Sequence, residues 1–169
     1  MLKKPSRRRL LQCVFALYCC ALLFLLFFSR SIWKDRTVLQ HFQEYANLVP
    51  FRTILYQGEG LLVGLRYLFG KHHAVTWQLR YFGTNLLGNL VMLFPLGLLL
   101  PCIAKSCRHM GRFLLLTVMG IVAVEIAQTL LRVGVTDVDD IILNTVGAIG
   151  GFLTFKIPAV RRFLLEERS

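Results

Sequence analysis

Charged residues are scarce in this chain, and acidic residues are the scarcest. Only 17% of its 169 residues are charged, with 9 Asp and Glu against 20 Lys and Arg, whereas 56% are hydrophobic. This balance excludes an ordinary soluble domain of this size and is typical of membrane proteins. A net charge of +11 could suit a nucleic-acid-binding protein, but no basic-aromatic module is present. Because the basic residues crowd beside apolar runs, topology and anionic lipid explain the charge better, and we expect no nucleic-acid partner.

The chain also lacks the residue patterns of disulfide, metal and hydrolase sites. Its five Cys are an odd number and lie mostly inside predicted helices, which does not suit a disulfide framework. Cys102 and Cys107 do not form a CxxC pair, and no His arrangement completes a zinc set. There is no Ser-His pair, HExxH motif or phosphatase-like Arg/His set. We therefore expect no metal and no cofactor. The sequence assigns no catalytic residue, and it favours a binding role over an enzyme.

Four apolar stretches are long enough to cross a bilayer, whose core of roughly 30 Å needs about 20 apolar residues per helix. They cover residues 10–28, 82–103, 113–131 and 138–157. We predict an all-α membrane protein with a single domain over residues 1–169, a bundle of four transmembrane helices and a longer extracytoplasmic loop after the first. Pro95 and Gly97 predict a kink in the second span. Gly147 and Gly151 form a GxxxG pair, which lets another helix approach closely.

The basic residues predict the orientation of these spans. Five Lys and Arg precede the first span, three lie in the loop after the second, and four lie at the C-terminal end. An arrangement with the N-terminus inside places these twelve of the twenty Lys and Arg in the cytoplasm. We therefore predict that the N-terminus and the C-terminus are both cytoplasmic.

Polar residues recur at one level of three predicted helices, in the half that this orientation assigns to the outer leaflet. A charged residue at mid-helix costs ~2.5–3.5 kcal/mol, so Glu125 requires a partner, a proton or water. We predict a polar outer-leaflet pocket, formed by Asn85, Asn89, Glu125, Gln128, Arg132, Asp137, Asp139, Asp140 and Asn144. Two structural alternatives stay open, namely hydrogen bonds that join helices and helix capping by the Asp residues.

Three stretches, NLVPF, NLLGNLVMLFPLG and EIAQTLLRVGVTDVDDIILNTVGAIGG, carry a family resemblance. Over residues 47–152 the chain resembles the VanZ-like family of small bacterial membrane proteins, whose named member is associated with resistance to the glycopeptide teicoplanin. The resemblance implies a location in the bacterial cytoplasmic membrane, without a reaction. The matching residues are those of the predicted pocket, with either Asp139 or Asp140 as the match at that point, together with Asn47, Pro50, Phe51, Pro95, Gly97, Gly147 and Gly151.

Three functions fit these observations. The first is a protein that binds or shields a cell-wall lipid precursor, a lipid headgroup or a lipophilic glycopeptide in the outer leaflet. The second is an intramembrane enzyme on a lipid-linked substrate, with Glu125 as general base and Asp140 as a metal ligand or second acid. The third is a small proton-coupled transporter, which would have to act as a homo-oligomer because four spans hold no internal repeat.

Overall fold

A computed structural model describes residues 7–28, 37–68 and 83–165, and the regular elements within these ranges are all helices. The predicted helical class is therefore confirmed for this part of the chain. In chain order the α-helices are α1 (Arg7–Leu23), α2 (Val38–Tyr45), α3 (Arg52–Leu68), α5 (Gly88–Met92), α6 (Phe94–Ile103), α7 (Met110–Leu131), α8 (Val138–Lys156) and α9 (Pro158–Leu165). Shorter turns of other helix types are η1 (Phe24–Phe28), η2 (Gly83–Leu87) and η3 (Lys105–Arg108).

Three of the four predicted spans form helices that are long and apolar enough to cross a membrane. Within the described ranges these helices are Arg7–Phe28, Met110–Leu131 and Val138–Lys156. The second predicted span forms instead a shorter apolar helix, Gly88–Ile103, which is interrupted at Leu93. Pro95 stands in the first turn of α6, where its missing N–H removes no hydrogen bond. The kink predicted for this span thus takes the form of a break between α5 and α6.

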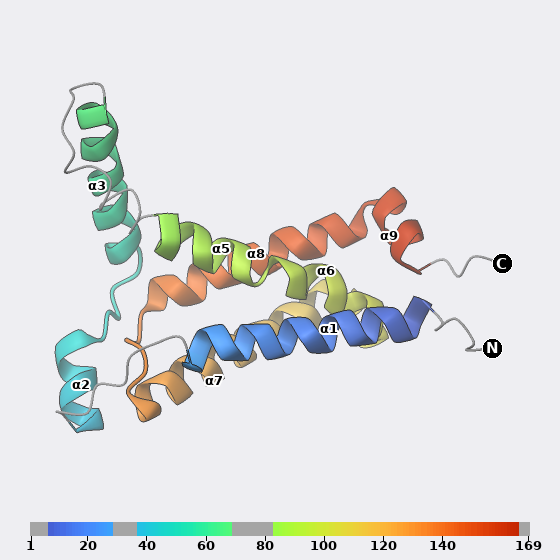
Figure 1. Cartoon of the computed structure of the whole chain (residues 1–169), viewed down its shortest axis with the longest axis horizontal. Helices are drawn as coiled ribbons and strands as arrows, with labels where there is room; N and C mark the ends of the chain where they lie inside the picture. Colours follow the sequence, from blue (N-terminus) through green and yellow to red (C-terminus); the bar gives the residue numbers. More distant parts are fainter. Residues whose placement is uncertain (1–6, 29–36, 69–82, 166–169) are drawn as a thin grey trace.

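Helix α8 lies at the centre of the bundle (Figure 1), with α5 and α6 packed along it and α7 beside it. The link from α7 to α8 is short, so α8 returns alongside α7. Helix α1 packs on α6 at the edge of the bundle and has no buried residue. The rings of Phe113 and Phe152 stack in the core with centroids 4.6 Å apart, surrounded by Leu93, Ile121 and Ala148.

Three glycines bring α8 into backbone contact with α5 and α6. A Cβ added at Gly147 would lie 1.9 Å from the carbonyl oxygen of Leu90, and one at Gly151 would lie 2.0 Å from that of Phe94. From the other side, a Cβ at Gly97 would lie 2.0 Å from the carbonyl oxygen of α8 at position 148. This close approach is what a GxxxG pair permits. Gly97 thus lies at a helix–helix contact within α6, whereas the break occurs at Leu93.

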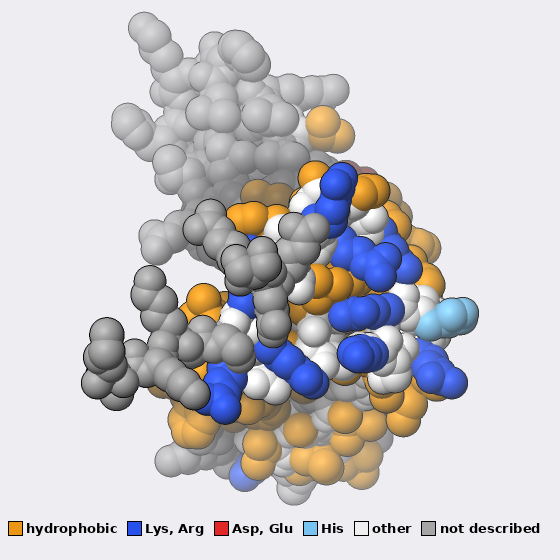
Figure 2. All heavy atoms as spheres, turned by 90° about the vertical axis from the view of Figure 1, so that its right-hand side faces the viewer, with side chains coloured by type: hydrophobic (Ala, Val, Ile, Leu, Met, Phe, Trp, Pro, Cys, Tyr) orange, Lys and Arg blue, Asp and Glu red, His pale blue; other side chains and the backbone are white. Residues whose placement is uncertain are grey.

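The two ends of the bundle differ in charge. Figure 2 shows the end that holds both termini, where many Lys and Arg side chains gather. Helices α2 and α3 lie at the opposite end, and α3 runs across the long axis of the bundle (Figure 1). The described acidic residues belong to α2, α3 and the segments near this opposite end, as Glu44, Glu59, Glu125, Asp137, Asp139 and Asp140.

Candidate functional site

The predicted pocket residues occupy different surroundings near the end of the bundle that carries α2 and α3. Asp137 and Asp139 hold the segment that precedes α3. Asn89 and Asp140 join α5 to α8, and Glu125 and Asn144 border a cavity inside the bundle. Those of the predicted pocket side chains that the structure describes therefore differ in the groups that they contact.

A loop clamp, formed by Asn47, Thr53, Asp137 and Asp139, joins the NLVPF segment to the start of α8. The backbone N–H of Asn47 donates to the Thr136 carbonyl at 2.8 Å, and its carbonyl accepts from the N–H of Val138 at 3.0 Å, forming an isolated parallel bridge. The Asn47 side-chain amide donates to the Thr53 hydroxyl and to the Asp137 carboxylate, both at 2.9 Å. Asn47 thus uses its backbone and its side chain for one long-range contact.

The carboxylate of Asp139 caps the beginning of α3 from a different helix. It accepts the backbone N–H groups of Phe51 at 2.5 Å, Thr53 at 2.7 Å and Ile54 at 3.1 Å. These donors have no partner within α3 because the first N–H groups of any helix lack an acceptor. Asp139 is 0% exposed, and its negative charge also suits the positive end of the α3 dipole. The capping alternative concerned the helix that the Asp residues themselves begin, and there the Asp137 side chain accepts the N–H of Asp139 at 2.9 Å.

Pro50 and Phe51 form the turn that leads from Asn47 into α3, next to the loop clamp. Arg52 N–H approaches the Val49 carbonyl at 3.4 Å, which makes Pro50 and Phe51 the central residues of a turn. Phe51 has a φ of 65°, a left-handed conformation that costs a residue with a side chain of this size about 1–3 kcal/mol. The hydrogen bond from its N–H to Asp139 helps to hold this conformation.

Asn89 and Asp140 connect two helices of the bundle core. The side-chain amide of Asn89 donates to the carboxylate of Asp140 in a buried hydrogen bond between α5 and α8. One turn along α8, the Asn144 amide donates to the Asp140 carbonyl at 2.9 Å. The bond between Asn89 and Asp140 is an interhelical polar contact, the structural alternative to a ligand site, whereas the bond from Asn144 lies within α8.

Gln128 lies with Glu125 among the buried residues of α7, as the helical spacing predicts, whereas Arg132 is the C-cap of this helix. The Gln128 amide donates at 2.8 Å to the carbonyl of Leu26, so it ties α7 to the end of the first span. Arg132 follows the last residue of α7 and adopts a left-handed φ of 56° at its C-cap. Arg132 thus stands at the C-cap of α7 and not in its last helical turn. Asn85 lies in η2, and its side chain is outside the described part of the structure.

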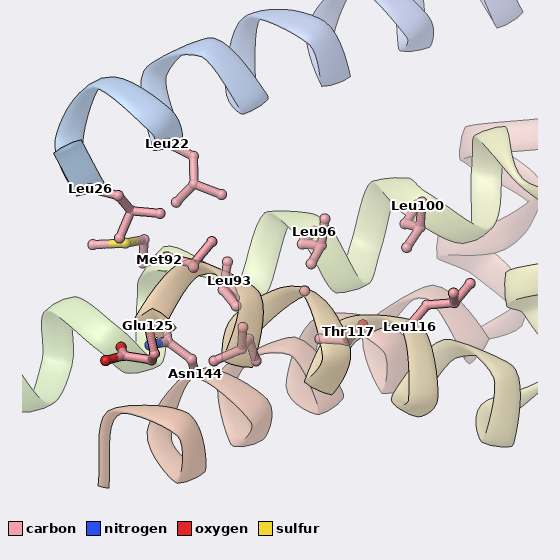
Figure 3. Close-up of a pocket in the computed structure, with 13 residues that line it drawn as sticks. Leu22, Leu26, Met92, Leu93, Leu96, Leu100, Leu116, Thr117, Glu125 and Asn144 are labelled. Carbon is pink, nitrogen blue, oxygen red and sulfur yellow. The ribbon is translucent and has the colours of Figure 1, made fainter. Parts of the chain in front are cut away.

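A cavity of about 270 Å³ lies between α1, α6 and α7, with Asn144 of α8 at its border. Most of its wall is aliphatic. Figure 3 shows Leu22 and Leu26 of the first span on one side, opposite the side chains of α7. The break between α5 and α6 also faces α1, because the Tyr18 hydroxyl donates to the Met92 carbonyl at 2.8 Å. That carbonyl lies where the broken helix leaves acceptors without intrahelical donors.

Glu125, Asn144 and Thr117 supply the polar groups of this cavity. Glu125 is 7% exposed, and Figure 3 shows its carboxylate close to Asn144 at one end of the aliphatic wall. Within the described residues, the Asn144 side-chain oxygen and the Thr117 hydroxyl have no hydrogen-bond partner. Buried polar atoms rarely remain without one, because each costs about 1–3 kcal/mol. The cavity therefore offers hydrogen-bonding groups next to a hydrocarbon surface.

Several residues with a role in this region were not found from the sequence. Thr53 donates to Asp137 at 2.6 Å, and His41 of α2 donates through Nε2 to the Gly134 carbonyl at 2.9 Å. Their partners are more than eighty residues away, so no local spacing pattern indicates them. Thr117 precedes Glu125 by eight residues on the same face of α7, a helical spacing that could have identified it.

Metal chemistry would need several ligands in one place. Within the described ranges, no group of three or more His, Cys, Asp or Glu side chains is placed to hold a metal ion. What the cavity itself offers is hydrogen bonding by the carboxyl group of Glu125 beside an aliphatic surface.

Comparison with known proteins supports the resemblance found in the sequence. The VanZ/LLP1 family matches residues 15–160 of the chain, a wider range than the residues 47–152 that carried the resemblance. Protein VanZ of Enterococcus faecium is 27% identical over 154 residues, which is 91% of this chain and 76% of that protein. No solved structure matches the chain significantly. Because the family match extends over most of its length, the chain belongs to the VanZ/LLP1 family.

Proposed function

We propose that this protein binds an amphiphile within the membrane and holds its hydrocarbon chain in the cavity beside Glu125. The observation that carries the proposal is the cavity itself, an aliphatic wall with Glu125, Asn144 and Thr117 at its polar positions. A hydrocarbon chain would contact the Leu side chains, while a polar group of the same molecule would meet Glu125 and the unpaired oxygen of Asn144.

The size of the cavity supports a chain rather than a whole antibiotic. Pockets that hold drug-sized ligands measure roughly 300–1,000 Å³, and this one measures about 270 Å³. An intact glycopeptide core is therefore too large, but a lipid chain is not. The resemblance to a family associated with teicoplanin resistance makes two ligands relevant, a cell-wall lipid precursor and the acyl chain of a lipophilic glycopeptide. No contact among the described residues favours the enzyme or the transporter over this binding function.

Filling the cavity, or replacing its carboxyl group, should weaken binding. In Leu96→Trp the larger ring occupies the cavity, and in Glu125→Gln the carboxylate is replaced by an amide of similar size. We expect both to weaken binding of teicoplanin or of a cell-wall lipid precursor at least about tenfold. Leu96→Trp takes up the space of the hydrocarbon chain, and Glu125→Gln removes a hydrogen bond to a charged group, which contributes roughly 1.5–3 kcal/mol. Affinity is measured on purified protein in lipid nanodiscs, with teicoplanin and its deacylated form titrated in parallel.

The matched control is Leu115→Trp, the same substitution at a residue of α7 that is 61% exposed and does not line the cavity. It should bind like the wild type. Equal affinity of the wild type and Leu96→Trp for both ligands would exclude the cavity as the site. Equal affinity of acylated and deacylated glycopeptide would exclude the chain as the group that is recognised.

The charge of the bundle ends supports an orientation with both termini in the cytoplasm. The end that carries Arg7, Lys105 and Arg162 is basic, as cytoplasmic loops of membrane proteins are. The cavity residue Glu125 and the loop clamp would then lie toward the outer leaflet of the bacterial cytoplasmic membrane.

Single cysteines at the two ends test this orientation. Tyr56 of α3 is 76% exposed, and Ser106 of η3 is exposed at the basic end. A membrane-impermeant maleimide should label Tyr56→Cys in intact cells, and Ser106→Cys only after the membrane is permeabilised. The parent chain is labelled in parallel because it contains five native Cys. Labelling of Ser106→Cys in intact cells would reverse the proposed orientation.

A further inference from the structure

The basic end of the bundle contains a groove that the proposed function does not use. Its volume is about 510 Å³, and it lies between the start of α1, the η3 turn and α9. Four cations line it, namely Arg7, Arg8, Lys105 and Arg108. Its other side chains are apolar, with Leu11 and Leu164 among them, and no described acidic residue lines it.

Two of the four cations are positioned by contacts with the protein, and two are not. The Arg108 guanidinium donates through Nε to the Pro101 carbonyl at 3.0 Å, and the Arg7 guanidinium lies 4.7 Å from the ring centroid of Phe163. Arg8 and Lys105 are exposed and have no hydrogen bond or ion pair with another described residue. Within the described part of the chain, the positive charge of the groove therefore has no acidic counterpart.

The lining of the groove matches the chemistry of a phospholipid. Guanidinium groups bind phosphate through paired hydrogen bonds, and a lysine adds a compact charge. In a membrane crossed by the helix Arg7–Phe28 the groove would lie at the level of lipid headgroups, because Arg7 is the first residue of this helix and Lys105 follows the end of α6. Leu11 and Leu164 provide an apolar surface for the segment of an acyl chain next to the headgroup.

We propose that this groove binds the phosphate of an anionic phospholipid, with one acyl chain against its apolar side. The site is separate from the Glu125 cavity, since the two share no lining residue. It differs from a diffuse basic surface because four cations from the first span and from the turn after α6 surround one concave volume. A diffuse surface would attract anionic lipid in proportion to charge, wherever the charge lies.

Two double variants separate the groove from the surrounding charge. Arg8→Gln with Lys105→Gln removes two cations from the groove, and Arg9→Gln with Arg112→Gln removes two exposed cations that do not line it. Both variants lose the same net charge, so they differ only in whether the lost cations line the groove. Binding of phosphatidylglycerol, phosphatidylcholine and inorganic phosphate to the full-length protein in detergent is measured by native mass spectrometry.

We expect phosphatidylglycerol to remain bound in preference to phosphatidylcholine. The groove variant should bind it about tenfold more weakly than the wild type, and the Arg9/Arg112 variant should bind it as the wild type does. Equal weakening in both variants would overturn the proposal in favour of a diffuse basic surface. Displacement of the lipid by an equal concentration of inorganic phosphate would also overturn it, because free phosphate would then be the ligand.

Discussion

Gly151→Ala should lower the thermal stability of the purified protein far more than the same change one residue earlier. The new methyl group would lie 2.0 Å from the Phe94 carbonyl oxygen and 2.9 Å from the Leu98 nitrogen. Because both are backbone atoms, they cannot rotate away as a side chain could, and α6 must move away from α8. This movement weakens the packing between α6 and α8 along their length. Overpacking typically costs about 1–3 kcal/mol. Because backbone atoms must move here, we expect the upper end of this range, which corresponds to a decrease in Tm of roughly 10 °C for a chain of this length.

Gly150→Ala is the matched control, because a Cβ at Gly150 meets only the ring of Phe94 at 3.5 Å, an ordinary contact. It should leave Tm within a few degrees of the wild type or raise it slightly, since alanine favours a helix more than glycine does. Melting is followed by intrinsic fluorescence in detergent and in nanodiscs. A similar Tm for the two variants would show that α8 and α6 do not pack as closely as described.

Asp139→Ala is the second change with a large expected effect, and its effect should centre on α3. The substitution leaves the N–H groups of Phe51, Thr53 and Ile54 without their acceptor. Each loss costs about 1–3 kcal/mol, although the three are not additive, so we expect a total near 3 kcal/mol. The strained Phe51 conformation also loses a contact that holds it.

Hydrogen exchange can distinguish this local effect from global unfolding. The amides of residues 51–54 should exchange much faster in Asp139→Ala, while those of α7 should change less. Glu59→Gln serves as a control because it removes one negative charge from an exposed position of α3 without touching the clamp. If the amides of residues 51–54 keep their protection in Asp139→Ala, Asp139 does not cap α3.

Residue patterns alone could predict much of the bundle. Runs of apolar residues indicated the spans, because a helix that crosses a membrane forms its backbone hydrogen bonds internally and presents apolar side chains to the lipid. Pro95 marked the interruption between α5 and α6, although the break at Leu93 leaves a shorter helix than predicted. The basic residues indicated a charged end, which the structure confirms as the end with the termini. The family resemblance over residues 47–152 is likewise confirmed, within the match to residues 15–160.

The roles of the individual acids could not be predicted in this way. Asp137, Asp139 and Asp140 are neighbours in sequence, yet two clamp the segment before α3 and the third meets Asn89 of α5. Glu125 lies in none of these contacts and borders the cavity instead. Helical spacing gives the direction in which each side chain leaves its own helix, but not what lies in that direction.

The sequence by itself therefore determined that this is a helical membrane protein, which end of it is basic, and which residues are polar inside it. These properties follow from composition and from local periodicity, and each depends on residues that are close in the chain. Only the tertiary structure decided that Asp139 caps α3, that Gln128 holds Leu26, and that Glu125 and Asn144 share a cavity. The bonds from Asp139 and Gln128 join residues that are 85 or more positions apart. They therefore depend on how the helices pack, and the close backbone contacts of α8 largely determine that packing.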